Sequence, residues 1–188
     1  MQWVIAASAS EFRADAETHI HLSDFIDWWI LVTLIEGGDS AGKNAYLYHD
    51  PAQAGGWRYV PWDFNHSFGQ DWLTQRVAAT SVESYKEFNR IFALLLEDPT
   101  TREMLRARYA ALLGGTLSEA AMSSHVEAMW AEIEPAARRD WRRWSSAYQT
   151  FPRWVHRTDF TDSDAELAYL RQWIRTRWRH LSTTFPDR

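Results

Sequence analysis

Cysteine is absent from the 188-residue sequence, and lysine occurs only as Lys43 and Lys86. The lack of thiols excludes disulfide bonds, thiolate metal sites and a cysteine nucleophile. No apolar run reaches the roughly 20 residues of a membrane-spanning helix. The basic residues are dispersed and the formal net charge is -5, so no basic surface indicates nucleic acid. We therefore expect neither nucleic acid nor a membrane as a partner.

The apolar residues that are present indicate one globular domain over residues 1–188. The hydrophobic fraction is 46%, which suits a chain of this length that buries a single core. The opening MQWVIAASAS has no basic region and too short an apolar stretch for a signal peptide. Most of the twelve tryptophans lie at helical spacing beside other apolar residues, which is typical of a core, although surface tryptophans can also bind carbohydrate.

Apolar residues recur at intervals of three and four over most of the chain, which predicts helices. Serine, threonine or aspartate precedes most of them, and glycine or proline follows. The expected helices run from Ser8 or Ser10 to about Thr18, from Ser23 to Gly37-Gly38, from Ser84 to Leu96, from Thr100 to Leu113, from Thr116 to Ile133, from Pro135 to Trp144, and from Asp162 or Ser163 to Leu181.

One stretch alternates between apolar and polar residues as strands do. Residues 45–49 (AYLYH) and 57–62 (WRYVPW) show this alternation, and DPAQAGG between them supplies the proline and glycines of a turn. The sequence therefore predicts one β-hairpin, followed by the loop DFNHSFGQDW. A single hairpin among many helices makes the fold class α+β, mostly helical.

Polar side chains suited to a metal ion flank the predicted hairpin. Asp39 and Asn44 come just before its first strand, and Asp63 comes just after its second. Because a hairpin returns the chain to its starting end, we expect these side chains to lie near one another. Their oxygens suit Mg²⁺ or Mn²⁺, which also bind phosphate. One interpretation is a phosphoryl-transfer site, and the other is that these residues only form turns.

The order of these residues matches the protein-kinase template. In that template an Asp accepts the proton of the substrate hydroxyl and an Asn five residues later binds metal; beyond a hairpin, an Asp-Phe pair binds the metal that bridges the phosphates. Asp39 and Asn44 have that spacing, and Asp63-Phe64 has that position. The Asp-x4-Asn spacing alone is a weak signal, and its place before a hairpin closed by a second Asp strengthens it.

The stretch DFIDWWILVTLIEGGDSAGKNAYLYHDPAQAGGWRYVPWDFNHSFG resembles the core of the CotH kinase-like family, also called the spore coat protein H family. The Asp-x4-Asn-x-Tyr-Leu-Tyr and Pro-Trp-Asp elements carry the resemblance. IEPAARRDWRRW and the Arg- and Trp-rich final helix resemble that family's C-terminal part, so nearly the whole chain is covered. The resemblance implies a protein-kinase-like large lobe that phosphorylates proteins, including spore coat proteins, with ATP and Mg²⁺ or Mn²⁺.

Carried over by position, the resemblance implies roles for five residues. Asp39 is the catalytic base, and Lys43 helps to neutralise phosphate charge unless it is simply a solvated lysine. Asn44 and Asp63 hold the metal and, through it, the nucleotide. Asn65, where many members carry a second Asp, is a further metal ligand.

Some features depart from an active kinase. Gly37-Gly38 replaces a more typical Asn-containing pair, no GxGxxG occurs, and neither lysine lies upstream of the predicted base. We expect the chain to correspond to the C-terminal lobe without the ATP-binding small lobe, with a face that could bind a second copy of itself.

Other functions remain open at this point. The chain could be a non-catalytic structural or interaction module of a spore coat or surface assembly, or it could bind carbohydrate. Transfer could be of a phosphoryl or an adenylyl group. The resemblance implies a spore-coat or extracytoplasmic location.

Overall fold

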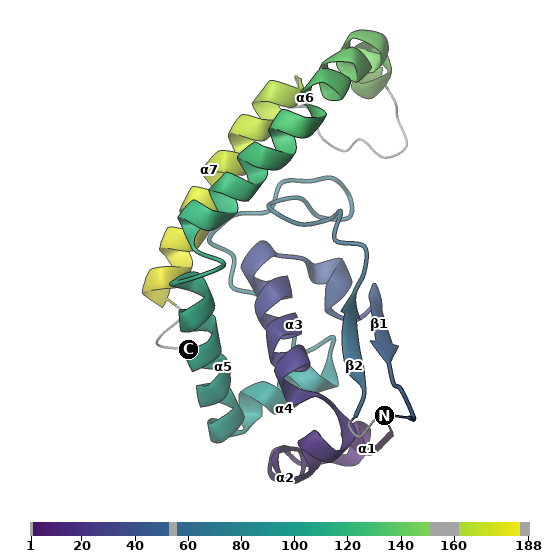
Figure 1. The fold of residues 1–188 in the computed structure, drawn as a ribbon, viewed down its shortest axis with the longest axis vertical. Coiled ribbons are helices and arrows are strands. Elements are labelled where there is room, and N and C mark those ends of the chain that lie inside the picture. Colours follow the sequence, from purple (N-terminus) through teal and green to yellow (C-terminus); the bar gives the residue numbers. More distant parts are fainter. Residues whose placement is uncertain (1, 53–55, 151–161, 185–188) are drawn as a thin grey trace. The chain divides into compact units, whose positions relative to one another are not determined.

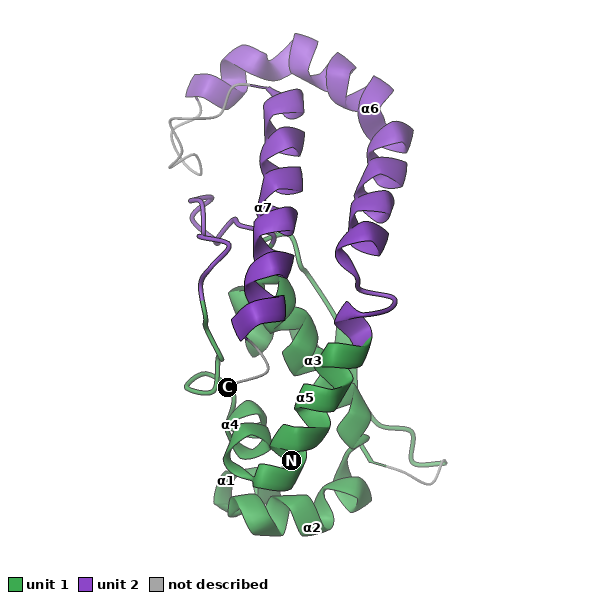
Figure 2. Cartoon of the chain, turned by 90° about the vertical axis from the view of Figure 1, so that its left-hand side faces the viewer, with its two compact units in different colours: residues 1–67, 82–111 green, residues 68–81, 112–188 purple. Residues whose placement is uncertain are grey.

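The computed structural model describes residues 2–52, 56–150 and 162–184, which form two compact units. Unit 1 contains residues 1–67 and 82–111, and unit 2 contains residues 68–81 and 112–188 (Figure 2). The expectation of one domain over residues 1–188 stays a prediction.

Along the described chain, one two-stranded sheet lies between a first run of helices and a second (Figure 1). The fold class is therefore confirmed as α+β and mostly helical. The elements are α1 (Gln2–Ala6), α2 (Ala9–His19), α3 (Leu22–Ile35), the 3₁₀ helix η1 (Gly38–Ala41), β1 (Ala45–Tyr48), β2 (Arg58–Pro61), α4 (Arg90–Glu97), α5 (Pro99–Leu113), α6 (Glu119–Thr150) and α7 (Ser163–Thr184).

Helix α3 forms the centre of unit 1. Ten of its 14 residues are buried, because it is apolar almost all round and has neighbours on several sides. It packs against β2, η1 and α4 (Figure 1). The Trp28 ring stacks on Tyr59 of β2 with centroids 4.3 Å apart, and it meets Phe92 of α4 edge-on at 4.8 Å. This tryptophan therefore joins the hairpin and α4 to the central helix.

Strands β1 and β2 form the predicted antiparallel hairpin. Tyr46 lies opposite Val60, and Leu47 lies opposite Tyr59. Because side chains alternate between the two faces, Tyr59 points toward α3 while Tyr46 and Val60 lie on the outer face. Trp62 lies diagonally across from Tyr46 on that face, with ring centroids 5.4 Å apart.

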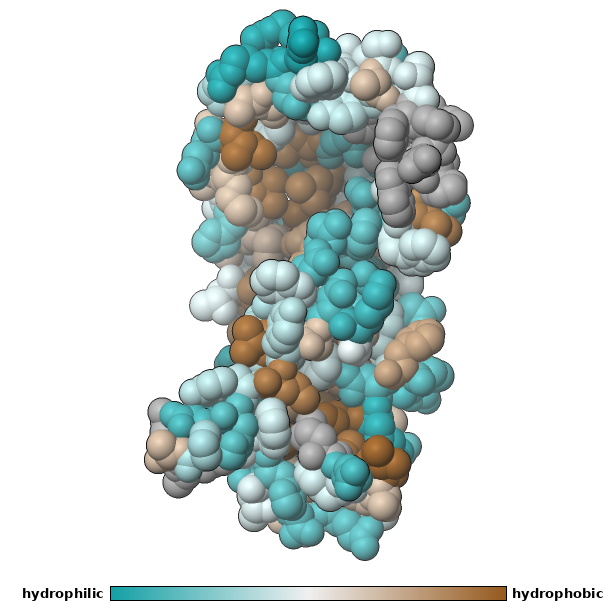
Figure 3. All heavy atoms as spheres, turned by 90° about the vertical axis from the view of Figure 1, so that its right-hand side faces the viewer, coloured by the Kyte–Doolittle hydropathy of each residue, from teal (hydrophilic) through white to brown (hydrophobic). Residues whose placement is uncertain are grey.

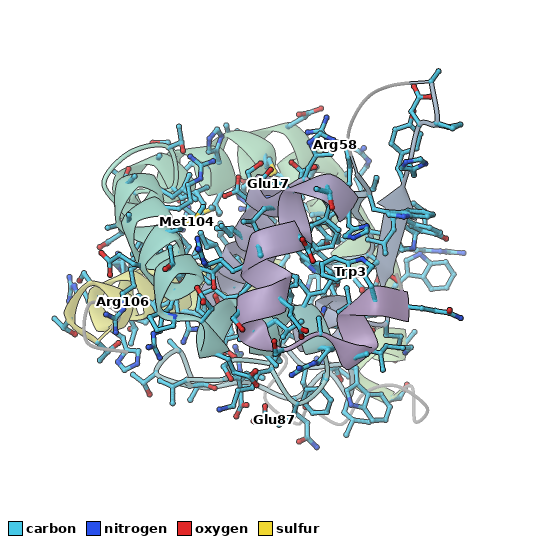
Figure 4. The ribbon with its side chains drawn as sticks, turned by 90° about the horizontal axis from the view of Figure 1, so that it is seen from below. Trp3, Glu17, Arg58, Glu87, Met104 and Arg106 are labelled. Carbon is cyan, nitrogen blue, oxygen red and sulfur yellow. The ribbon has the colours of Figure 1, made fainter. Side chains whose placement is uncertain are left out.

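The start of β2 is fastened to the segment between α2 and α3. The Trp57 N–H donates to the His19 carbonyl at 2.7 Å, and the His21 N–H donates to the Trp57 carbonyl at 3.0 Å. Glycine is required at position 56, since a Cβ there would lie 1.9 Å from the His19 carbonyl carbon. Arg58, labelled in Figure 4, also donates to Asp24 of α3 at 2.8 Å. The hairpin is therefore fixed to the core at one end.

Several helix boundaries follow the sequence signals. Ser8 caps α2 in a capping box with Glu11, and Asp162 accepts from the Ala165 N–H at the start of α7. Helix α5 ends at Leu113, before the predicted glycine pair. Helix α3 begins at Leu22, one residue before the predicted Ser23.

Helices α4 and α6 depart most from their predicted boundaries. Helix α4 begins at Arg90 rather than Ser84, because Tyr85 has a left-handed backbone (φ 56°) and the Asn89 side chain accepts from the N–H groups of Ile91 and Phe92. The predicted break at Pro135 is also absent, since α6 continues through it to Thr150. Figure 2 shows α6 changing direction along its length, as helices with an internal proline do.

Unit 2 consists of α6 and α7 lying side by side, with the 68–81 loop held by α7. Tyr169 and Trp173 donate to the carbonyls of Gly69 and Val77, each at 2.9 Å. The buried Arg177 donates to the Ala79 carbonyl at 3.1 Å. In neither unit does the described chain include a helix long and apolar enough to cross a bilayer.

Candidate functional site

The site begins where α3 ends and the chain turns into η1. Glu36 takes a left-handed conformation (φ 56°, ψ 43°) that stops the helix, and the Gly37 N–H donates back to the Val32 carbonyl at 2.9 Å. The next residues form η1, which places Asp39 in its first turn. We call residues 36–44 the Asp39 loop.

The structure brings three predicted site residues into direct contact in this loop. The Asn44 amide nitrogen donates to Asp39 Oδ2 at 2.8 Å, and the Lys43 ammonium nitrogen lies 3.3 Å from Asp39 Oδ1. The backbone N–H of Asn44 also donates to the Asp39 carbonyl at 3.1 Å. Each carboxylate oxygen of Asp39 therefore has a partner, which fixes the orientation of the group.

The two contacts of Asp39 differ in strength. The Asp39 side chain is 19% exposed, so its hydrogen bond from Asn44 is partly shielded and contributes about 1.5–3 kcal/mol. The Lys43 side chain is 77% exposed, and an ion pair so open to water contributes about 1 kcal/mol or less. Asn44 therefore holds the carboxylate, while Lys43 can leave it at little cost.

Ser40 connects the Asp39 loop to Asp63 on the other side of the hairpin. Its side chain is buried, and its hydroxyl donates to the Asp63 carbonyl at 2.9 Å. The Asp39 loop also lies close to the segment after β2 at Gly37, where a Cβ would lie 3.4 Å from the Phe64 ring. The segments before and after the hairpin therefore meet, as expected, through Ser40 and the Asp63 backbone, whereas the closeness of the Asp63 carboxylate to Asp39 and Asn44 stays a prediction.

Asp63 and Asn65 lie at the surface beyond β2. Asp63 is exposed and has a left-handed backbone with φ 56°. Among the described residues, no hydrogen bond or ion pair holds its carboxylate, in contrast to Asp39. Asn65 is also exposed, and its amide nitrogen lies 3.2 Å from Nε2 of His66. Asp63 thus offers an accessible carboxylate.

The donor atoms present fit a hard divalent cation that retains water and phosphate oxygens as ligands. Across residues 2–52, 56–150 and 162–184, no three His, Asp or Glu side chains gather closely enough to hold a metal by themselves. The available oxygens are those of the Asp63 carboxylate and of the Asn44 and Asn65 amides. Mg²⁺ commonly takes one or two carboxylates and completes its shell with water and phosphate. Metal and ATP binding stay predictions.

Residues that the sequence analysis did not single out support the site. The Trp28 indole N–H donates to the Ser40 carbonyl at 2.9 Å, and the Asn89 side chain donates to the Ala41 carbonyl at 2.7 Å. The helical spacing of Trp28 indicates a core position but not this hydrogen bond. No pattern in the sequence places residue 89 beside residue 41.

Comparison with known proteins supports the family resemblance found in the sequence. A family model described as CotH kinase protein matches residues 1–181. The inner spore coat protein H of Bacillus subtilis (strain 168) is 22% identical over 126 residues. That match covers 67% of this chain and 34% of the relative, so the chain spans about a third of the relative's length.

Proposed function

This chain belongs to the CotH kinase protein family, and from that premise we propose that it forms the large lobe of a protein-kinase-like enzyme. The reaction is transfer of the γ-phosphoryl group of ATP to a serine or threonine hydroxyl of a protein. One observation carries the proposal. The Asp39 loop, in which Asn44 donates to Asp39, is hydrogen-bonded through Ser40 to the backbone of Asp63.

In this proposal Asp39 orients the acceptor hydroxyl and takes its proton. The bond between the γ-phosphorus and its bridging oxygen breaks, ADP leaves, and the hydroxyl oxygen forms the new bond to phosphorus. The hydrogen bond from Asn44 supports this role because it fixes the carboxylate without burying it completely. Precise placement of the acceptor is a large part of catalysis in such reactions.

The oxygens of Asp63, Asn44 and Asn65 would hold Mg²⁺ or Mn²⁺. When bound, the ion would neutralise the negative charge that the phosphates carry during transfer. Lys43 would move from Asp39 toward the phosphates, a change that its exposure makes inexpensive. The nucleotide is therefore the second proposed partner, beside the acceptor protein.

The proposed acceptor and location come from the relative's name. That relative is named an inner spore coat protein. We therefore propose a coat or surface protein as the acceptor, and the spore coat as the place of action.

A mass-spectrometric transfer assay tests this function. The chain is incubated with Mn²⁺·ATP, alone and with casein as a generic acceptor, and the products are searched for phosphoserine and phosphothreonine. Asp39→Asn should abolish incorporation, whereas Asp50→Asn, at the end of the hairpin, should not. Incorporation that survives Asp39→Asn would contradict the assignment, and AMP on the acceptor would show adenylyl transfer instead.

The outer face of the hairpin supports a second candidate function, a structural module that associates with a further copy of the chain. Tyr46, Tyr48, Val60 and Trp62 are each between 41% and 57% exposed. Figure 3 views the side of the molecule that carries the hairpin; on its hydropathy scale tyrosine and tryptophan are pale, and the brown residues scattered among them are the strongly apolar ones. Exposed apolar clusters mark interaction surfaces.

Sedimentation velocity tests this second function. The native chain should show a dimer that Trp62→Ser weakens and Asp39→Ala leaves unchanged. A native chain that sediments as a monomer at all concentrations would contradict it.

A further inference from the structure

The Asp39 loop is held from a second direction by the segment that precedes α4, residues 82–89. At the downstream end of η1, Asn89 donates to the Ala41 carbonyl at 2.7 Å. At the upstream end, the Tyr85 hydroxyl donates to Oε2 of Glu36 at 2.9 Å. Glu87, labelled in Figure 4, lies on the outside of this segment. One short segment thus contacts the loop on both sides of Asp39.

The contact between Tyr85 and Glu36 is buried. Glu36 is 5% exposed and Tyr85 is 7% exposed. A carboxylate in such surroundings is stable only when its oxygens are hydrogen-bonded. The phenol supplies one of these bonds, so Glu36 and the backbone that follows it depend on Tyr85 for their position.

The Tyr85 ring also touches the residue directly before Asp39. A Cβ built on Gly38 would lie 3.0 Å from Cε1 of the ring and 3.5 Å from its hydroxyl oxygen. Tyr85 therefore contacts Glu36 through its oxygen and Gly38 through its ring edge. These two residues stand three and one positions before Asp39, so a shift of the ring moves the start of η1.

Both partners adopt a backbone conformation that residues other than glycine rarely use. Glu36 and Tyr85 each have φ of 56°. Positive φ is sterically unfavourable for bulky residues. Residues strained in this way cluster at functional sites, where a particular geometry is needed. Two strained residues that meet through one hydrogen bond beside Asp39 indicate that the contact serves the site as well as the core.

We propose that Tyr85 is a positioning residue, which sets the orientation of the Asp39 carboxylate by fixing Glu36 and Gly38. Its effect on turnover rests on the proposed function, whereas its effect on the loop does not. The contacts described for Tyr85 are with Glu36 and Gly38, upstream of Asp39, so we expect its loss to affect the catalytic step more than metal and nucleotide binding.

The test uses Tyr85→Phe, which removes the hydroxyl and keeps the ring. Its matched control is Tyr109→Phe, which removes a buried phenol oxygen from α5 in the same unit. Amide hydrogen exchange is followed at Ser40 and Asn44, whose N–H groups donate to the Gly37 and Asp39 carbonyls at 3.0 Å and 3.1 Å. Tyr85→Phe should speed exchange at both amides roughly tenfold relative to the control.

Phosphotransfer kinetics supply the second readout. We expect kcat to fall roughly tenfold in Tyr85→Phe while KM for ATP stays within about twofold. Equal exchange in the two variants, or faster exchange with native kcat, would overturn the proposal. If the native chain transfers no phosphate, that result counts against the proposed function, and the exchange data alone decide on Tyr85.

Discussion

Replacing Ser40 by alanine should separate the two halves of the site while the fold survives. The Ser40 side chain is 1% exposed, and its hydroxyl donates to the Asp63 carbonyl at 2.9 Å, with the Trp62 carbonyl farther away at 3.5 Å. One neutral hydrogen bond contributes about 1 kcal/mol. A free-energy difference of ~1.4 kcal/mol corresponds to a factor of ten in affinity. If the Ser40–Asp63 hydrogen bond stabilises the conformation that binds Mn²⁺·ATP, its loss should therefore raise the Kd about fivefold.

Calorimetric titration and urea unfolding measure the two consequences of this substitution. The free energy of unfolding should fall by about 1 kcal/mol. Thr101→Val is the matched control, since it removes a buried hydroxyl that donates to the Leu95 carbonyl at 2.8 Å, away from the site. The control should lose similar stability and bind Mn²⁺·ATP normally. Native affinity in Ser40→Ala, or an equal loss of affinity in the control, would refute the reasoning.

Further predictions concern Lys43, Tyr59 and Gly56. Lys43→Gln should change the free energy of unfolding by less than about 1 kcal/mol but weaken ATP binding, and unchanged affinity by calorimetry would argue against its contact with phosphate. Burial raises the pKa of the Tyr59 phenol above its ordinary value of about 10, so its contribution to stability is present below about pH 10 and is lost as the pH rises further. Tyr59→Phe should reduce this alkaline loss in denaturant titrations, and an unchanged pH profile would exclude the residue as its source. Gly56→Ala should lower the melting temperature, because its Cβ would collide with the backbone at His19, and unaltered melting would show that the backbone there can move.

The sequence predicted the parts of the site that depend on local order. Alternation and turn residues located the hairpin, and the placement of Asp39, Asn44 and Asp63 around it followed from hairpin geometry. The structure places Asp39 and Asn44 in contact and links their loop to Asp63. Their roles with metal and ATP stay predictions.

Long-range contacts explain what the sequence did not predict. Residues 84–89 have helical spacing, yet Tyr85 turns left-handed to reach Glu36, and the helix starts only after Asn89. The link from Ser40 to Asp63 joins residues 23 positions apart through a backbone carbonyl, which no side-chain pattern records. Proline at position 135 was expected to break a helix, but α6 continues through it.

The most direct test of the account is calorimetric titration of Mn²⁺·ATP into the native chain and into Asp63→Ala, with Asp50→Ala as the control. The accessible carboxylate of Asp63 is the proposed main metal ligand, whereas Asp50 accepts a backbone hydrogen bond from Ala52 at 2.9 Å in the turn. We predict saturable binding by the native chain and the control, and its loss in Asp63→Ala. Binding that persists in Asp63→Ala, or is absent from the native chain, would contradict the proposed metal-nucleotide site.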